Sequence, residues 1–383
     1  MTNDRRFAGK TALMLLAALL LLSSAAANAT VSVRDFGAKG DGKTDDTPAF
    51  QRALAAGGGE LFIPEGQYRI ANLKIPDGTM VRGVGVRSTI TMPPDVEAAM
   101  LPGNDCALTD LHFVGSPDDK ASPIGHGLVL LRYVHGVSLA RLTMENSPRC
   151  GVITDHAEYF RVADSHFKGV AAGVMVVFSH HGIISGNFVE DAKMHGMQFW
   201  GNWNFEQKDV SDLAFTGNVI RNVGGGGIWG TGGVRIAVTG NTVDGAGDIC
   251  LDYEWCDDSS IVGNTVRNGK NAGISLFYGC MNITIAGNTV VVPEETEAAV
   301  KALFPYDDTK GKPGWPYVGI WLTDPDRPKF PKDLGHRVIA ITGNTVRVEG
   351  PKRPAVYIGV DSHDVTLSGN VLSNGDVVDK TKP

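Results

Sequence analysis

Thr239-Gly240-Asn241-Thr242-Val243 recurs, with small changes, as Val262-Gly263-Asn264-Thr265-Val266 and Ala286-Gly287-Asn288-Thr289-Val290. Four further asparagines continue the pattern, and neighbouring copies are 31, 23, 23, 24, 56 and 26 residues apart: Asn187, Asn218, Asn344 and Asn370 complete the set. Degenerate copies at Asp164-Ser165-His166-Phe167 and Arg141-Leu142-Thr143-Met144 extend the register upstream. Gly and Asn tolerate the left-handed backbone of a tight turn, and stacked asparagines can hydrogen-bond in a ladder. The phrase therefore predicts one equivalent turn in every repeat.

A second phrase precedes each copy: a small residue followed by alternating apolar positions, as in Gly151-Val152-Ile153-Thr154 and Gly273-Ile274-Ser275-Leu276. Short alternating segments bounded by Gly and Asn are typical of strands. Strand-rich units of this length indicate a β-solenoid, since propeller blades need about 40–45 residues and the leucine-rich frame is absent. The two long spacings place insertions near residues 200–210 and 293–335, and we expect the longer one to border a groove as a lid.

The N-terminus has the features of an export signal. Arg5, Arg6 and Lys10 precede an apolar run, and Ala27-Asn28-Ala29 suits a cleavage site, which predicts a signal peptide at 1–29 and a secreted or periplasmic protein. The full chain has a net charge of −7, and removal of residues 1–29 would make it −9. An acidic chain without basic runs is a poor partner for nucleic acid, and no second apolar stretch offers a membrane span.

The start of the mature chain predicts a cap on the solenoid. Thr47 suits a helix N-cap, Pro48 suits the first turn, and Ala49 to Ala56 favour a short helix. We assign 30–80 to this cap module, 81–376 to the solenoid and 377–383 to a tail.

The cap module also carries a resemblance, in Val33-Arg34-Asp35-Phe36-Gly37-Ala38-Lys39-Gly40-Asp41-Gly42-Lys43-Thr44-Asp45-Asp46 and Leu61-Phe62-Ile63-Pro64-Glu65-Gly66-Gln67-Tyr68. These stretches resemble the N-terminal module of the pectate-lyase-like β-helix superfamily. The resemblance implies an all-β, single-stranded right-handed parallel β-helix. Its members include glycoside hydrolases, polysaccharide lyases, epimerases and phage tail-spike enzymes, and the fold alone does not choose among them.

Alternation within the first strand of each repeat separates residues that face the core from residues that face outward. With the small residue as zero, offsets two, four and six should form one continuous outward surface that binds a polysaccharide. The expected outward residues are Val129, Leu131, Ile153, Asp155, Gln198, Trp200, Asn202, Trp229, Thr231, Cys250, Asp252, Glu254, Ser275, Phe277, Trp321, Thr323 and Tyr357.

Asp252 and Glu254 are the candidate catalytic residues on this surface. Two positions along one strand face are about 6.5–7 Å apart, which suits the acid and base of an inverting glycosidase. Close like charges also separate the two pKa values, as an acid–base pair requires. The alternative interpretation is a pair of ordinary solvated carboxylates.

Other residues are candidates for supporting roles. Trp200, Trp229 and Trp321, with Gln198, Phe277 and Tyr357, are expected to bind sugar. Asp155, His156, His195 and Asp324 are candidate acid–base or supporting groups, although Asp155 should lie four coils, roughly 19 Å, from the pair.

Three functions stay open at this point. The first is a polysaccharide glycoside hydrolase. The second is a uronate lyase or epimerase, for which Asp252, Glu254 and Asp257 would suit calcium, although nothing in the sequence requires a cofactor. The third is a glycan-binding solenoid without catalysis. The polygalacturonase-type order of motifs is not kept, because Gly125-His126-Gly127 precedes Asp257-Asp258.

Cysteine usage adds one structural expectation. There are five cysteines, and Cys256 and Cys280 lie one coil apart, close enough to be bridged. Cys250 is expected beside Asp252 on the outward surface.

Overall fold

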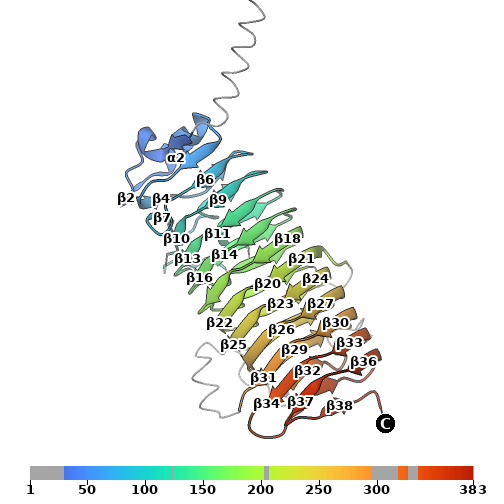
Figure 1. Ribbon diagram of the computed structural model, residues 1–383. Coiled ribbons are helices and arrows are strands. Elements are labelled where there is room, and N and C mark those ends of the chain that lie inside the picture. The colour runs from blue at the N-terminus through green and yellow to red at the C-terminus, as the bar shows by residue number, and fades with distance from the viewer. Residues whose placement is uncertain are drawn as a thin grey trace, which may run out of the picture.

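The chain forms a parallel β-solenoid of about 13 turns, in which 54% of residues are in strands and 5% are helical. The computed structural model describes residues 30–116, 118–122, 125–201, 207–294, 318–326 and 335–382. Each turn contributes one strand to each of three parallel sheets, and the sheets enclose one long core (Figure 1). The predicted all-β parallel β-helix is confirmed.

Sheet A contains thirteen strands along the first side of the solenoid: β1 (Thr30–Ser32), β3 (Glu60–Phe62), β6 (Met80–Arg82), β9 (Ala107–Thr109), β12 (Ser138–Ala140), β15 (Arg161–Ala163), β18 (His180–Ser185), β21 (Val210–Thr216), β24 (Gly233–Thr239), β27 (Asp257–Val262), β30 (Met281–Ala286), β33 (Arg337–Thr342) and β36 (His363–Ser368). Sheet B also contains thirteen: β2 (Asp41–Asp45), β4 (Gly66–Arg69), β7 (Ser88–Thr91), β10 (His112–Val114), β13 (Thr143–Glu145), β16 (His166–Lys168), β19 (Phe188–Glu190), β22 (Val219–Val223), β25 (Thr242–Ala246), β28 (Thr265–Gly269), β31 (Thr289–Val292), β34 (Thr345–Val348) and β37 (Val371–Ser373). Sheet C contains twelve: β5 (Leu73–Ile75), β8 (Met100–Pro102), β11 (Gly127–Arg132), β14 (Cys150–Asp155), β17 (Val174–Val177), β20 (Met197–Trp200), β23 (Ile228–Thr231), β26 (Ile249–Glu254), β29 (Ala272–Phe277), β32 (Val318–Leu322), β35 (Val356–Ile358) and β38 (Val377–Asp379).

The N-terminal end is closed by the short 3-10 helix η1 (Val33–Phe36) and by α2 (Thr47–Ala55). Phe50 and Ala53 of α2 are buried, so the helix covers the open end of the core. The N-cap is Asp46 and Thr47 is the first helical residue, so the helix begins one position earlier than the sequence suggested. The Asp46 carboxylate does not cap the helix, because it accepts the backbone N–H groups of Lys39 and Gly40 at 2.6 and 3.1 Å.

The asparagine ladder runs along the corner between sheets A and B. Each side-chain Oδ1 accepts both the backbone N–H and the Nδ2–H of the preceding asparagine, at 2.9 and 2.9 Å between Asn218 and Asn241. The other Nδ2 hydrogen goes to a backbone carbonyl one coil further back, as from Asn241 to Phe215 at 2.9 Å. Every polar group of these buried amides is therefore used, and the predicted ladder is what the structure contains.

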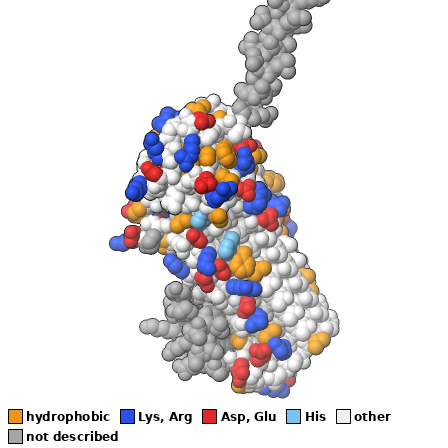
Figure 2. Space-filling model, turned by 60° about the vertical axis from the view of Figure 1, so that its left-hand side comes forward, with side chains coloured by type: hydrophobic (Ala, Val, Ile, Leu, Met, Phe, Trp, Pro, Cys, Tyr) orange, Lys and Arg blue, Asp and Glu red, His pale blue; other side chains and the backbone are white. Residues whose placement is uncertain are grey.

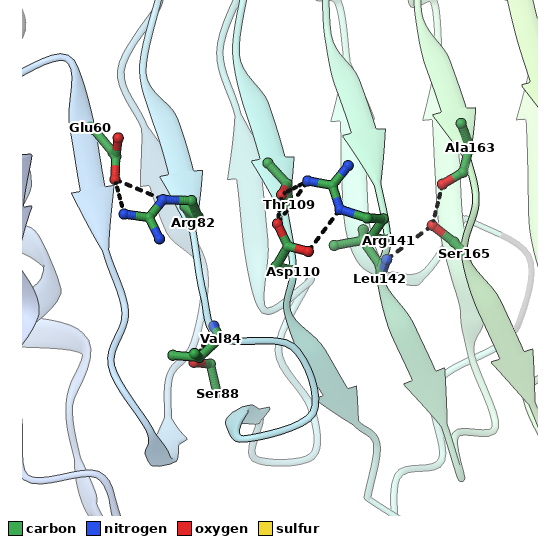
Figure 3. Close-up of polar contacts among 10 residues, drawn as sticks. All are labelled: Glu60, Arg82, Val84, Ser88, Thr109, Asp110, Arg141, Leu142, Ala163 and Ser165. Carbon is green, nitrogen blue, oxygen red and sulfur yellow. Dashed lines mark hydrogen bonds and ion pairs between the residues drawn. The ribbon is translucent and has the colours of Figure 1, made fainter.

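Upstream of the asparagines, another side chain makes the hydrogen bonds at the equivalent turn (Figure 3). Ser165 occupies the ladder position, where its Oγ accepts Leu142 N–H at 3.1 Å and donates to the Ala163 carbonyl at 2.7 Å. On the surface beside it, Arg141 contacts Asp110 of the neighbouring coil through two hydrogen bonds of 2.8 Å. The degenerate copies thus keep the turn while changing the residue.

Two expectations about chain ends and insertions need adjustment. The predicted tail contains β38, which pairs with β35 and so extends sheet C. Within the predicted insertion 293–335, β32 returns to sheet C between β29 and β35. The remainder of that insertion at 295–317 and 327–334, most of the insertion near 200–210, and the predicted signal peptide lie outside the described residues. Across the described ranges, no helix has the length and apolar character needed to cross a membrane.

The five cysteines are all buried and form no disulfide. Cys256 and Cys280 do stack in adjacent coils, where Cys256 N–H donates to Cys280 Sγ at 3.3 Å, so the predicted proximity holds but the bridge does not form.

Candidate functional site

The outward side of sheet C, called here the outer face, carries two rows of side chains that run along the solenoid. Strand pairing places Gln198 next to Trp229, Trp229 next to Asp252, and Asp252 next to Ser275 in the first row. The second row passes through Trp200, Thr231, Glu254 and Phe277. Neighbouring strands lie about 4.8 Å apart, so each row is a line of side-chain contacts.

One part of the predicted register was wrong. Val129 and Leu131 belong to the core, whereas Leu130 and Arg132 face outward. The cause is that Gly127 pairs with Cys150 and not with Gly151, so the small residue of this coil is displaced by one position. A one-residue displacement exchanges the two faces of a strand.

Asp252 and Glu254, called here the acid pair, lie on β26 with Tyr253 between them in the core. The sequence predicts that both side chains lie on an open surface. In the structure both are buried, because Asp252 is 3% exposed and Glu254 is 8% exposed. Asp252 Oδ1 accepts a hydrogen bond from Ser275 Oγ at 2.6 Å. The interpretation as freely solvated carboxylates is therefore wrong.

Burial changes the proton affinity of this site. Loss of solvation, reinforced by the neighbouring Glu254 carboxylate, raises the pKa of Asp252 well above its ordinary value, against the opposing effect of Ser275. A raised pKa favours the protonated form of the carboxyl group, which is the form that can donate a proton. The two carboxyl groups thus differ in surroundings, since Asp252 contacts a hydroxyl and Glu254 contacts an indole N–H.

Trp229 connects the acid pair to His195. Its Nε1–H donates to Glu254 Oε1 at 3.1 Å, and its ring stacks on His195 with centroids 5.1 Å apart and planes 13° apart. His195 Nδ1 accepts Gly226 N–H at 2.8 Å, so the neutral ring carries its proton on Nε2. Burial lowers the pKa of His195 to about 4, which makes it a neutral positioning group and not a base that titrates near pH 7.

Aromatic side chains follow the acid pair toward the C-terminal end. Phe277 and Trp321 are both 8% exposed and meet edge to face with centroids 5.2 Å apart. Tyr357 follows in the next strand, and its Oη donates to Asp324 Oδ2 at 3.0 Å. Asp324 also accepts Val360 N–H at 2.8 Å. These contacts of Asp324 are with the C-terminal coils, beside Tyr357.

The N-terminal part of the outer face is separate from the acid pair. Asp155 is four strands from Glu254, about 19 Å by strand spacing, as expected. Asp155 Oδ2 accepts Arg132 Nε–H at 2.9 Å, and its Oδ1 lies 2.7 Å from His156 Nδ1. His156 is exposed at the corner and stacks on Tyr133 at 4.8 Å. These two residues do not join the acid pair.

Sequence reasoning missed several side chains that shape the site. Ser275 was placed on the surface without its role as partner of Asp252, and Arg132 was hidden by the register displacement. Arg149, which is fully buried and paired with Asp119, carried no sequence signal beyond its charge. Cys250 was placed outward but lies in the core, where it donates to the Arg267 carbonyl.

The three carboxylates that would suit calcium come from two different sheets. Asp257 begins β27 of sheet A, around the corner from Asp252, and forms an ion pair with Lys208. Within the described ranges, no three His, Cys, Asp or Glu residues are placed to hold a metal ion. Acidic and basic side chains are interspersed on the face in Figure 2, without one continuous basic area.

Comparison with known families supports the fold from both ends of the chain. The model of the right handed beta helix region matches residues 150–327. A second model, Rhamnogalacturonase A/epimerase, pectate lyase-like, matches residues 30–111, where the sequence resemblance was found.

Relatives found by sequence match only a short segment of the chain, whereas solved structures with the same fold match most of it. Alginate lyase 7 of Azotobacter vinelandii is 33% identical over 115 residues, which are 24% of this chain and 13% of that protein. The A-module of mannuronan C-5 epimerase AlgE6 from the same organism has a TM-score of 0.67 at 16% identity, covering 91% of this chain and 99% of the module. PfbA, a surface adhesin of Streptococcus pneumoniae, has a TM-score of 0.69 at 14% identity, covering 91% of each chain.

The sequence relatives thus share only a short segment with this chain, and the structural likeness shows the fold. Together, the solenoid of about 13 turns and the two family models show that the chain has the right-handed parallel β-helix fold, and that residues 30–111 match the pectate-lyase-like model.

Proposed function

We propose that this protein is a carbohydrate-active enzyme that hydrolyses glycosidic bonds of a polysaccharide. The observation that carries the proposal is the acid pair: two carboxyl groups on one strand face, with the pKa of Asp252 raised well above its ordinary value. Inverting glycosidases need a protonated carboxylic acid and a carboxylate separated widely enough to admit a water molecule. Positions two apart on a strand, about 6.5–7 Å along the chain, meet that requirement.

The roles follow from the surroundings of each group. Asp252 donates its proton to the leaving glycosidic oxygen, while the Glu254 carboxylate removes a proton from the attacking water. Trp229 holds Glu254 Oε1 in place, and the His195 ring fixes the plane of Trp229. Trp200 and Trp321 provide flat apolar surfaces for sugar rings on either side of the pair.

The test is a product-resolved screen of the purified chain against neutral and acidic polysaccharides, with Asp252→Asn and Glu254→Gln as variants. Each substitution should lower kcat by about 10²–10⁴-fold, which is the range for lost general acid or base catalysis, and should leave the fold intact. Asp258→Asn is the matched control, because Asp258 is an exposed carboxylate of β27, in sheet A, that accepts a hydrogen bond from Asn282. Full activity of both acid-pair variants would refute the assignment.

A uronate lyase or epimerase is the second candidate, favoured by the local sequence match to an alginate lyase. It would release an unsaturated or an epimerised product, and it would require a basic residue and a cation that neutralises the uronate. Loss of activity with a calcium chelator, together with an ultraviolet-absorbing product, would support it over hydrolysis. Binding without any product would support the third function, a glycan-binding solenoid.

We further propose that residues 1–29 direct export, so that the enzyme meets its polysaccharide outside the cytoplasm. N-terminal sequencing of the protein recovered from the culture medium or periplasm should then begin at Thr30. Retention of residues 1–29 in the mature protein would contradict this.

A further inference from the structure

A cavity lies on the outer face, away from the acid pair. Its volume is about 230 Å³, and its apolar lining comes from Ile153, Met175, Val177, Phe178 and Trp200. Ile153 and Met175 are each 1% exposed and form its floor together with Val177. We call this cavity the sheet C pocket.

The polar edge of the pocket carries one basic side chain and two acidic ones. Arg132 donates to Asp155 Oδ2 at 2.9 Å and also pairs with Glu97. One guanidinium between two carboxylates gives this edge a formal negative charge, so it offers no unpaired cation to a uronate or a sulfate. A polyanionic sugar is therefore disfavoured at this position.

The apolar floor restricts what a neutral sugar can place there. A hydroxyl group buried against Ile153, Met175 and Val177 would lose its hydrogen bonds to water without replacement, which is costly. A methyl group has no such requirement and gains from leaving water. The pocket is thus complementary to a methyl-bearing substituent.

The pocket lies in line with the proposed catalytic centre along sheet C. Trp200 lines it and lies in the same row as Thr231 and Glu254, two strands or about 10 Å away. A glycan strand lying along the outer face would therefore reach both places at once.

We propose that the sheet C pocket binds the methyl group of a substituted neutral sugar unit, located a few units along the chain from the bond at the acid pair. The methyl group can belong to an O-acetyl ester or to a 6-deoxy sugar, since both present the same apolar surface. This assignment deepens the proposed function and rests on it for the position of the bond that is cleaved.

The experiment measures binding, and so it does not depend on turnover. Full-length Glu254→Gln protein is titrated calorimetrically with xylan and glucomannan oligosaccharides that are partially O-acetylated, and with the same oligosaccharides after alkaline deacetylation. Rhamnosides are compared with the corresponding mannosides as the 6-deoxy arm. We expect the methyl-bearing member of at least one pair to bind about tenfold tighter, which is the discrimination one methyl-sized group gives in an apolar pocket.

Two pocket variants test where the preference arises. Val177→Thr keeps the side-chain shape and adds a hydroxyl, and Met175→Gln keeps nearly the same volume, so each should reduce the preference to near unity while affinity for the unsubstituted member changes little. Val371→Thr makes the same chemical change at an exposed position of β37 and should leave the preference intact. Circular dichroism checks that each variant is folded.

The outcomes separate the two proposals. Equal binding or no binding across all pairs, tighter binding of uronate oligosaccharides, or an unchanged preference in folded Val177→Thr overturns the pocket assignment. Full hydrolytic activity of both Asp252→Asn and Glu254→Gln overturns the catalytic assignment and leaves the binding preference standing. An acetyl preference alone or a 6-deoxy preference alone identifies the source of the methyl group.

Discussion

The asparagine ladder and the outer face of sheet C both run along the solenoid, but the ladder repeats one residue and the outer face does not. Along the ladder, seven coils place the same residue at the same corner, and consecutive amides make the same set of hydrogen bonds. Along the outer face, the first row passes through Met175, Gln198, Trp229, Asp252 and Ser275 without one repetition. The ladder fixes the geometry of each coil, and this leaves the outer face free to differ between coils and to hold chemistry.

The largest stability effect is expected at a contact that occurs once. Arg149 is fully buried, forms an ion pair with Asp119 and donates to the Glu97 carbonyl at 2.9 Å. Because Glu97 also pairs with Arg132, this contact supports the edge of the sheet C pocket. Arg149→Met should lower the free energy of unfolding by about 3–5 kcal/mol, since it leaves a buried carboxylate without its cation.

Urea denaturation monitored by circular dichroism measures this loss. The control is the double variant Arg149→Met with Asp119→Asn, which removes the isolated charge while an amide oxygen can still accept Ala121 N–H. The double variant should recover part of the stability. No recovery would mean that packing of the arginine side chain, and not the charge pair, stabilises this region.

The ladder should show a graded response. Asn241→Ala removes the acceptor of two N–H groups from Asn218 and the donor to Phe215, all in the buried interior. Each unsatisfied buried group costs about 1–3 kcal/mol, and with partial relaxation we expect a loss of about 2–4 kcal/mol.

Asn370→Ala is the matched substitution at the end of the ladder. Asn370 is half-buried and no further asparagine accepts from it, so water can replace its contacts and the loss should be about 1 kcal/mol. Equal losses at the two positions would show that the ladder does not stabilise the coils through burial of its amides.

The contrast between the repeated ladder and the non-repeating outer face explains what the sequence could predict. The Asn phrase recurs, so the solenoid, the turn and the ladder followed from the repeat, and the resemblance of the cap module supplied the parallel β-helix. Asp252, Trp229 and Trp321 were placed on the outer face because their strands kept the common offset. Val129 and Leu131 were misplaced because the first long strand of sheet C departs from that offset by one residue.

Burial was the part that spacing could not supply. The alternation of β26 places Asp252 outward, but its 3% exposure depends on packing across coils that are distant in sequence. The pairing of Arg132 with Glu97, and of Arg149 with Asp119, likewise joins segments 30 to 35 residues apart without any periodic signal. Contacts that occur once leave no pattern to recognise.

The smallest expected effect is a pH dependence of stability that arises around the acid pair. The folded state raises the pKa of Asp252 above its ordinary value of 3.8, so between that value and its folded pKa the native protein binds more protons than the unfolded chain. Stability from this group is fully present below about pH 4 and falls as the pH rises, by at most about 1.4 kcal/mol per pH unit. His195 acts in the opposite direction: its pKa is lowered from 6.5 to about 4, so its contribution is lost as the pH falls through that interval.

The two contributions can be separated by urea unfolding at several pH values between 4 and 7. Relative to the parent protein, Asp252→Asn should gain stability increasingly as the pH rises, because the parent must ionise a buried carboxyl group. His195→Asn, whose amide oxygen can still accept Gly226 N–H, should gain relative to the parent as the pH falls toward 4. Asn241→Ala should show the same loss at every pH, because an amide does not titrate in this range. A pH-dependent loss at Asn241, or parallel pH profiles for the parent and Asp252→Asn, would mean that the ladder and the outer face are not electrostatically distinct.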